Sequence, residues 1–140
     1  MELEFKNDCN GVDWQLVSDT LRQVGMAYHR PDNHKKAFAN SYAVVFVYYE
    51  GKMIGFGRAV SDGAYQSAVY DIAIAPEYQK QGIGTAVMED LLERLPAGNV
   101  ILYANPGKEG FYETMGFRRM KTAMARFKRP DIMQEKGLTE

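Results

Sequence analysis

The stretch that decides the fold is Asp71-Ile72-Ala73-Ile74-Ala75-Pro76-Glu77-Tyr78-Gln79-Lys80-Gln81-Gly82-Ile83-Gly84-Thr85. It reads as an apolar strand, a short loop that contains glycine, and the start of a helix over residues 82–95. In that helix, apolar residues recur at four-residue intervals, which predicts one buried face. Unpaired N–H groups and the positive end of a helix dipole would meet at residue 82, and together they bind phosphate well.

Three kinds of phosphate loop compete for this stretch. A P-loop needs lysine between its last glycine and the Ser or Thr, and Gly84 is followed directly by Thr85. The dinucleotide fingerprint needs a third glycine three residues on, where this chain has Val87. Gly55-Phe56-Gly57 lies inside a predicted strand and indicates a bulge or a close contact. What remains is the pattern Gln-x-x-Gly-x-Gly.

Working outward, the chain alternates between the strand period and the helix period. Leu3 and Phe5 alternate with charged residues, which predicts a short edge strand. The further predictions are helices over residues 13–24, 33–40 and 109–115, strands over 43–49, 52–61, 67–75 and 100–104, and one or two strands within 117–128. Strands mixed with helices in this way predict an α/β (α+β) fold with a mixed central sheet flanked by helices.

Length and composition limit the alternatives. We expect one domain over 140 residues, with a core at about 3–128 and a loosely ordered tail over 129–140. The net charge of -1 argues against nucleic acid as a partner. One cysteine and two histidines argue against a disulfide framework or a metal site. We see no signal peptide or membrane span, so we expect a cytoplasmic protein without membrane partners.

The segment Gln79-Lys80-Gln81-Gly82-Ile83-Gly84 resembles the acyl-CoA site of the GNAT superfamily of N-acetyltransferases. Downstream, Asn105 followed by Phe111-Tyr112-Glu113-Thr114-Met115-Gly116-Phe117 resembles the second conserved segment of that superfamily. The resemblance covers about residues 42–127. Lys108 is a departure, because many members have alanine at that place.

The resemblance implies a three-layer fold in which the strands 67–75 and 100–104 run parallel and splay apart around acetyl-CoA. It implies that Gln79 and Lys80 begin the pyrophosphate loop, whose amides are those of Gln81, Gly82, Ile83, Gly84 and Thr85. It also implies that the pantetheine arm bonds along Ile72, Ala73 and Ile74, and that Asn105 bonds this arm or braces the splayed strand.

Amine acetylation needs a neutral amine, a polarised thioester carbonyl and a proton for the leaving thiolate. Tyr112 matches the superfamily's tyrosine, and a phenol suits the last task. Asp71 is the one carboxylate in its apolar strand, so it is a candidate base or amine anchor, with a structural hydrogen-bonding role as the alternative. Asp62 is expected to cap a turn rather than face the acceptor. Tyr28, His29, Arg30 and His34 are expected to face solvent, in the region where family members shape the acceptor site.

These features predict an acyl-CoA-dependent N-acyltransferase of the EC 2.3.1 type, with acetyl-CoA as co-substrate and no metal. The amine of a small molecule would attack directly in a ternary complex, because Cys9 lies too far upstream to indicate a nucleophile. The alternatives are a non-catalytic acetyl-CoA-binding module and a protein acetyltransferase acting on lysine or an N-terminus. A homodimer is also an expectation, since many members of the superfamily form one.

Overall fold

A computed structural model describes all residues of the chain, 1–140, which form two compact units, residues 1–102 and 103–140. The first unit holds β1 (Leu3–Lys6), α1 (Trp14–Gln23), α2 (Pro31–Ala39), β2 (Ala43–Tyr49), β3 (Lys52–Ser61), β4 (Gln66–Ile74), the 3₁₀ turn η1 (Pro76–Tyr78), α3 (Ile83–Arg94) and β5 (Asn99–Ile101). The second unit holds α4 (Glu109–Glu113) and α5 (Pro130–Glu135). The prediction of a single domain stays a prediction.

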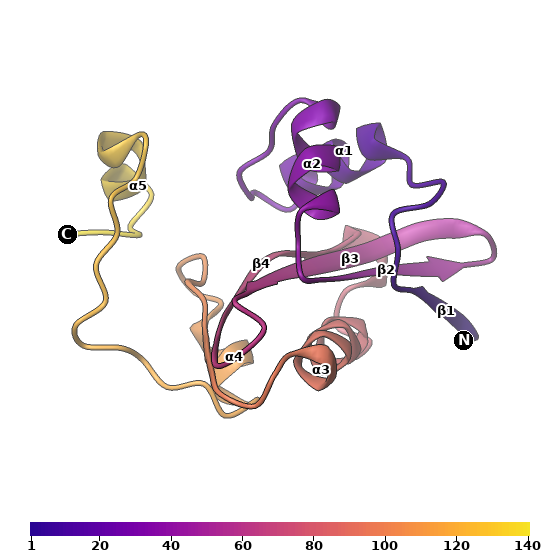
Figure 1. Cartoon of the computed structure of the whole chain (residues 1–140). Helices are drawn as coiled ribbons and strands as arrows, with labels where there is room; N and C mark the ends of the chain where they lie inside the picture. The colour runs from indigo at the N-terminus through magenta and orange to yellow at the C-terminus, as the bar shows by residue number, and fades with distance from the viewer. The chain divides into compact units, whose positions relative to one another are not determined.

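A five-stranded sheet in the order β1-β2-β3-β4-β5 forms the centre of the first unit. Neighbouring strands within β1–β4 are antiparallel, and β5 is parallel to β4. The helices α1 and α2 cover one face and α3 covers the other (Figure 1). The predicted mixed α/β fold is therefore confirmed.

The core on the α1 and α2 side consists of apolar side chains from both helices and from three strands. These are Val17, Leu21, Phe38, Val44, Phe46, Met53, Phe56 and Ala73. Trp14 at the start of α1 packs its ring on Phe38 and Phe46 at centroid distances of 5.5 and 5.9 Å. Asp13 caps α1 by accepting a hydrogen bond from the N–H of Leu16.

Gly57 allows α3 to lie close to the other face of the sheet. A Cβ built at this residue would come within 3.0 Å of side-chain atoms of Ile72 and Val87 and within 3.2 Å of Leu91. At Gly55 the same test gives 2.6 Å to Ile74. Both glycines are thus close-contact sites in the interior of β3, as the sequence predicts.

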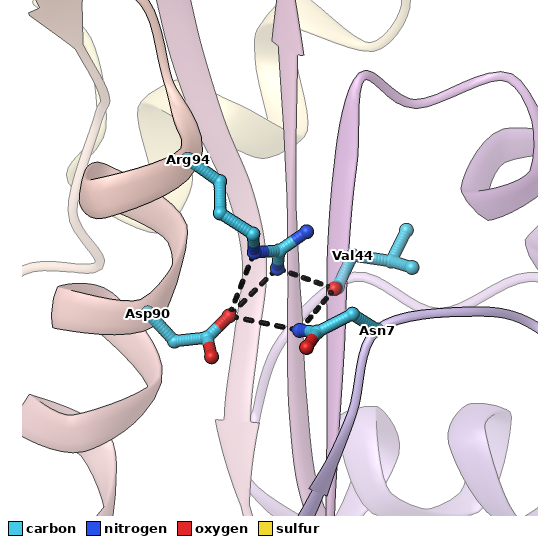
Figure 2. A network of polar contacts seen from close by, with 4 residues as sticks. All are labelled: Asn7, Val44, Asp90 and Arg94. Carbon is cyan, nitrogen blue, oxygen red and sulfur yellow. Dashed lines mark hydrogen bonds and ion pairs between the residues drawn. The ribbon is translucent and has the colours of Figure 1, made fainter.

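A polar network fastens α3 to the strands beside it (Figure 2). Arg94 Nη2 donates to Asp90 Oδ1 and to the carbonyl oxygen of Val44 in β2, both at 2.6 Å. Asn7 Nδ2 donates to the same two oxygens at 3.0 and 3.2 Å. The network joins three parts of the chain: the segment that follows β1, the strand β2, and the C-terminal half of α3. Polar bonds as well as apolar contacts therefore fix the direction of α3.

The structure corrects one prediction in the second unit. The predicted strands within 117–128 are wrong, because this segment contains neither strand nor helix. Its side chains are exposed apart from two half-buried phenylalanines, Phe117 and Phe127. Residues 129–140 contain the short helix α5, and Pro130 occupies its first turn, where the missing N–H costs nothing. The predicted loose order of this tail stays a prediction.

Candidate active site

The loop before α3 presents a row of backbone N–H groups that have no acceptor in the protein. Gln79 N bonds the carbonyl of Pro76 at 3.3 Å, and Ala86 N bonds that of Gly82 at 3.1 Å, but the amides of residues 80–85 between them bond nothing. No side chain caps α3, in contrast to α1 with its Asp13. Unsatisfied donors at the positive end of a twelve-residue helix are suited to binding an anion.

The backbone conformation of this loop keeps the donors accessible. Lys80 and Gly82 have φ values of +63° and +82°, the left-handed region in which successive N–H groups turn toward one side. A Cβ placed on Gly82 would meet no heavy atom within 4 Å, so the space over this residue is open. The two glutamines are exposed but donate to the protein's own backbone, Gln79 Nε2 to the carbonyl of Ile74 at 3.0 Å and Gln81 Nε2 to that of Glu77 at 3.4 Å.

The strand before the loop has a free edge. β4 pairs with β5 only over Gln66–Asn99, Ser67–Val100 and Ala68–Ile101. Residues 72–74 of β4 lie beyond this short pairing, and alternate N–H and C=O groups there can bond an extended ligand. The structure confirms the expected parallel strands that pair at one end and separate at the other. Ile72, Ala73 and Ile74 lie on the part of β4 that is not paired with β5.

Asp71 sits at an irregularity of β4. The register between β3 and β4 shifts between Phe56 and Arg58, so that one extra residue of β4 is accommodated there. Asp71 has a φ of +57°, which is rare for a residue other than glycine but tolerated by aspartate. Its carboxylate is half-buried and accepts a hydrogen bond from Arg58 Nε at 2.6 Å. The sequence indicates a partnered or perturbed carboxylate here but does not identify Arg58.

His34 lies in the same region and corrects an expectation. We expect it to face solvent, yet only 2% of its surface is exposed, whereas Tyr28, His29 and Arg30 are exposed as expected. Its Nε2 accepts a hydrogen bond from the backbone N–H of His29 at 2.9 Å. Burial lowers the pKa of His34, and the nearby Asp71 opposes this shift only in part.

Asn105 and Tyr112 belong to the second unit. Tyr112 is the fourth residue of α4, and its ring packs edge-on against Phe111 and Phe117 at 5.0 and 6.1 Å. Burial raises the pKa of Tyr112, so its phenol keeps its proton and remains a donor at neutral pH. The carbonyl of Asn105 accepts a bond from Lys108 N at 3.0 Å in the turn before α4.

The surroundings of Asp62 and Cys9 indicate structural roles for both residues. Asp62 Oδ1 accepts hydrogen bonds from the N–H groups of Ala64, Tyr65 and Gln66 at 2.7 to 3.1 Å, which confirms the predicted turn cap. These bonds hold the pKa of Asp62 below its ordinary value. Cys9 packs beside the core, and its burial raises the pKa of the thiol, which disfavours the reactive thiolate.

The structure has no group of three or more His, Cys, Asp or Glu side chains that could hold a metal ion. None of its helices combines the length and the apolar character needed to cross a membrane.

Known proteins resemble this chain over most of its length. Residues 12–117 match the model of the acetyltransferase (GNAT) family. The chain is 30% identical over 118 residues to GCN5-related N-acetyltransferase 1 of Arabidopsis thaliana, a chloroplastic protein, and 29% identical over 119 residues to serotonin N-acetyltransferase 2 of rice, also chloroplastic. It is 38% identical over 124 residues to histone acetyltransferase TAP1 of Glycine max.

These alignments take in 81%, 80% and 79% of this chain but only 60%, 60% and 52% of the relatives. The chain thus spans little more than half the length of these curated proteins. Among solved structures, a GNAT family acetyltransferase of Streptococcus pneumoniae superposes with a TM-score of 0.76 at 26% identity, covering 91% of this chain and 99% of the other. With the family match over most of its length and the fold in agreement, this chain belongs to the acetyltransferase (GNAT) family.

Proposed function

We propose that this chain transfers the acetyl group of acetyl-CoA to the primary amine of a small molecule, by direct attack in a ternary complex. The observation that carries the proposal is the run of unbonded amides over residues 80–85 directly after the free edge of β4. An anionic head with an extended amide-bearing arm is the kind of ligand that satisfies both features.

The residues fit such a ligand in two ways. The amides of residues 81–85 would bond its pyrophosphate, with the open space over Gly82 admitting the phosphate oxygens. Those N–H and C=O groups of Ile72, Ala73 and Ile74 that point away from β3 and carry no other bond would bond the pantetheine arm as a neighbouring strand would. Gln79 would act indirectly, by holding the loop to the end of β4 through its bond to Ile74.

The chemistry assigns different tasks to Asp71 and Tyr112. Asp71 would anchor the amine and take up a proton as the new carbon–nitrogen bond forms. A backbone N–H of β4 would polarise the thioester carbonyl. Tyr112 would give its phenolic proton to the thiolate as the carbon–sulfur bond breaks, a task that its raised pKa is consistent with at neutral pH. The half-buried thiol of Cys9 plays no part in this scheme.

A second candidate is transfer to a protein amine, a lysine or an N-terminus. It is favoured by one observation, the 38% identity to a relative named a histone acetyltransferase. The relative named a serotonin N-acetyltransferase favours the small amine instead. A homodimer and a cytoplasmic location stay predictions.

The test is release of free thiol from acetyl-CoA in the presence of candidate acceptors. We would screen arylalkylamines, polyamines, amino acids and aminoglycosides beside lysine-containing peptides. Thiol release with a small amine supports the proposal, and release with peptides alone replaces it by the second candidate. Binding of acetyl-CoA without release with any acceptor would identify a non-catalytic acetyl-CoA-binding module and refute both.

A further inference from the structure

Arg58 is the single partner of the Asp71 carboxylate, and it reaches Asp71 from the neighbouring strand. The Nε–Oδ2 distance is 2.6 Å, and the side chains are only 18% and 21% exposed. The bond engages Oδ2 and leaves Oδ1 available to another donor.

The guanidinium of Arg58 is itself held from several directions. It lies over the rings of Phe38 and Tyr70, with its carbon 5.8 and 5.3 Å from their centroids. Its Nη1 donates to Ser41 Oγ at 3.4 Å, and that hydroxyl donates to the carbonyl of Ala37 at 2.7 Å. A side chain fixed by α2, β4 and the segment before β2 has little freedom left to lose when it orients a carboxylate.

The backbone of Asp71 needs such support. Because of its positive φ and the register shift beside it, the Asp71 side chain points in a different direction from that of a residue in a regular strand. This conformation costs free energy, so it persists where the surroundings hold it. The titratable groups that interact with the carboxylate are Arg58 on β3 and His34 on α2. Among these, only Arg58 bonds it.

We propose that Arg58 is a positioning residue for acyl transfer, which holds Asp71 by Oδ2 so that Oδ1 faces the incoming amine. This rests on the proposed function. Arg58 touches neither substrate in this scheme, so its whole effect on turnover passes through Asp71. An ion pair with a purely structural role would instead change stability and leave turnover per folded molecule unchanged.

The test is a double-mutant cycle on the amine identified by the thiol-release screen. We would measure kcat, the KM for the amine, the Kd for acetyl-CoA and the melting temperature. The variants are Arg58→Gln, Arg58→Lys, Asp71→Asn and the double variant Arg58→Gln/Asp71→Asn. Asparagine suits position 71 because it tolerates a positive φ.

We expect Arg58→Gln to lower kcat by about 10- to 100-fold, the effect of a misplaced reacting group, with the Kd for acetyl-CoA unchanged. Arg58→Lys keeps a charged donor, so we expect a smaller loss. In the Asp71→Asn background, Arg58→Gln should have no further effect on kcat. Equal losses in both backgrounds, or an unchanged kcat in Arg58→Gln, would overturn the positioning role.

The matched control is Arg94→Gln. Arg94 and Asp90 form an ion pair of the same 2.6 Å distance and similar exposure within α3, and their further bonds go to Asn7 and to Val44 in β2 (Figure 2). We expect this variant to lower the melting temperature and leave kcat unchanged. If Arg94→Gln lowers kcat as much as Arg58→Gln, the Arg58 effect is one of general stability and the inference is wrong. Absence of thiol release by the wild-type protein would refute the proposed function itself, and the inference with it.

Discussion

The backbone N–H of His29 donates a hydrogen bond to Nε2 of His34, at 2.9 Å. Ser18 in α1 donates to the carbonyl of the same His29 at 2.6 Å. The segment between α1 and α2 is thus held from both sides, and one of the two bonds requires His34 to be unprotonated at Nε2. This relationship makes the stability of the α1 and α2 layer sensitive to pH.

We predict that the protein becomes less stable as the pH falls from 7.5 to 5.5. Burial lowers the pKa of His34 in the folded protein, so the unfolded chain, in which this histidine has its ordinary pKa of about 6.5, takes up the proton first. The stabilisation is therefore complete above that value and is lost as the pH falls through the folded pKa. Urea unfolding at several pH values measures it.

The variants His34→Gln and His29→Gln separate this contribution from the other titrating groups. Glutamine at 34 can still accept the bond but cannot be protonated, so the decline with pH should be smaller, with a cost of about 1 kcal/mol at pH 7.5 for poorer geometry. His29→Gln keeps the N–H donor and should keep the decline. A decline that is equally steep in His34→Gln would contradict the assignment.

Gly82→Ala should weaken acetyl-CoA binding at least tenfold. The added methyl group projects into the open space where the pyrophosphate is placed, and the positive φ of 82° adds strain of about 1 kcal/mol. Gly51→Ala is the control, because its φ is +77° and its Cβ also meets nothing within 4 Å, but it lies in the turn between β2 and β3. Calorimetric titration should show normal affinity for Gly51→Ala. An equal loss of acetyl-CoA affinity in the two variants would show that backbone strain, and not the lost space over Gly82, causes the effect.

Tyr112→Phe should lower kcat by about 100-fold while acetyl-CoA binding is retained, because the ring contacts with Phe111 and Phe117 survive and only the proton donor is removed. Tyr65→Phe, at a residue that is 64% exposed, is the control and should be fully active. Steady-state thiol release measures both. Undiminished turnover in Tyr112→Phe would show that another group protonates the thiolate.

Cys9→Ser should keep the kcat of the wild-type protein. In a direct-attack mechanism no acetyl-enzyme forms, and the burial that raises the pKa of the Cys9 thiol disfavours a nucleophilic role. A small loss of stability is expected, since a hydroxyl replaces a sulfur packed beside the core. Mass spectrometry of the wild-type protein after incubation with acetyl-CoA should find no acetyl group on Cys9, and finding one there would contradict direct attack.

Patterns local in the sequence were sufficient for much of the fold. The bounds of β2 and β3 agree with the prediction because β-branched and aromatic runs are interrupted by Glu50-Gly51, which form the turn. The start of α3 agrees to one residue because Gly82 takes a left-handed conformation at its N-cap. Each signal depends on the conformational preferences of adjacent residues.

The parts that could not be predicted depend on contacts between distant residues. A strand exists only with a partner, and the composition of residues 117–128 does not show whether one is present. The Arg58–Asp71 pair depends on the β3–β4 register and its shift. The burial of His34 did have a local signal, since Phe38 lies four residues later on the same face of α2 and is 1% exposed. The polar residues that surround His34 in the sequence made this signal hard to recognise.

The most direct test of the central claim is titration of the ¹⁵N-labelled protein with coenzyme A, followed by amide resonances. We predict that signals of residues 81–85 and of Ile72, Ala73 and Ile74 move with one binding curve. The amide of Leu16 at the start of α1 should stay in place, because Asp13 already accepts its hydrogen bond at 3.1 Å. Unmoved signals over residues 81–85, or equal movement at α1, would contradict the assignment of this loop as the acetyl-CoA site.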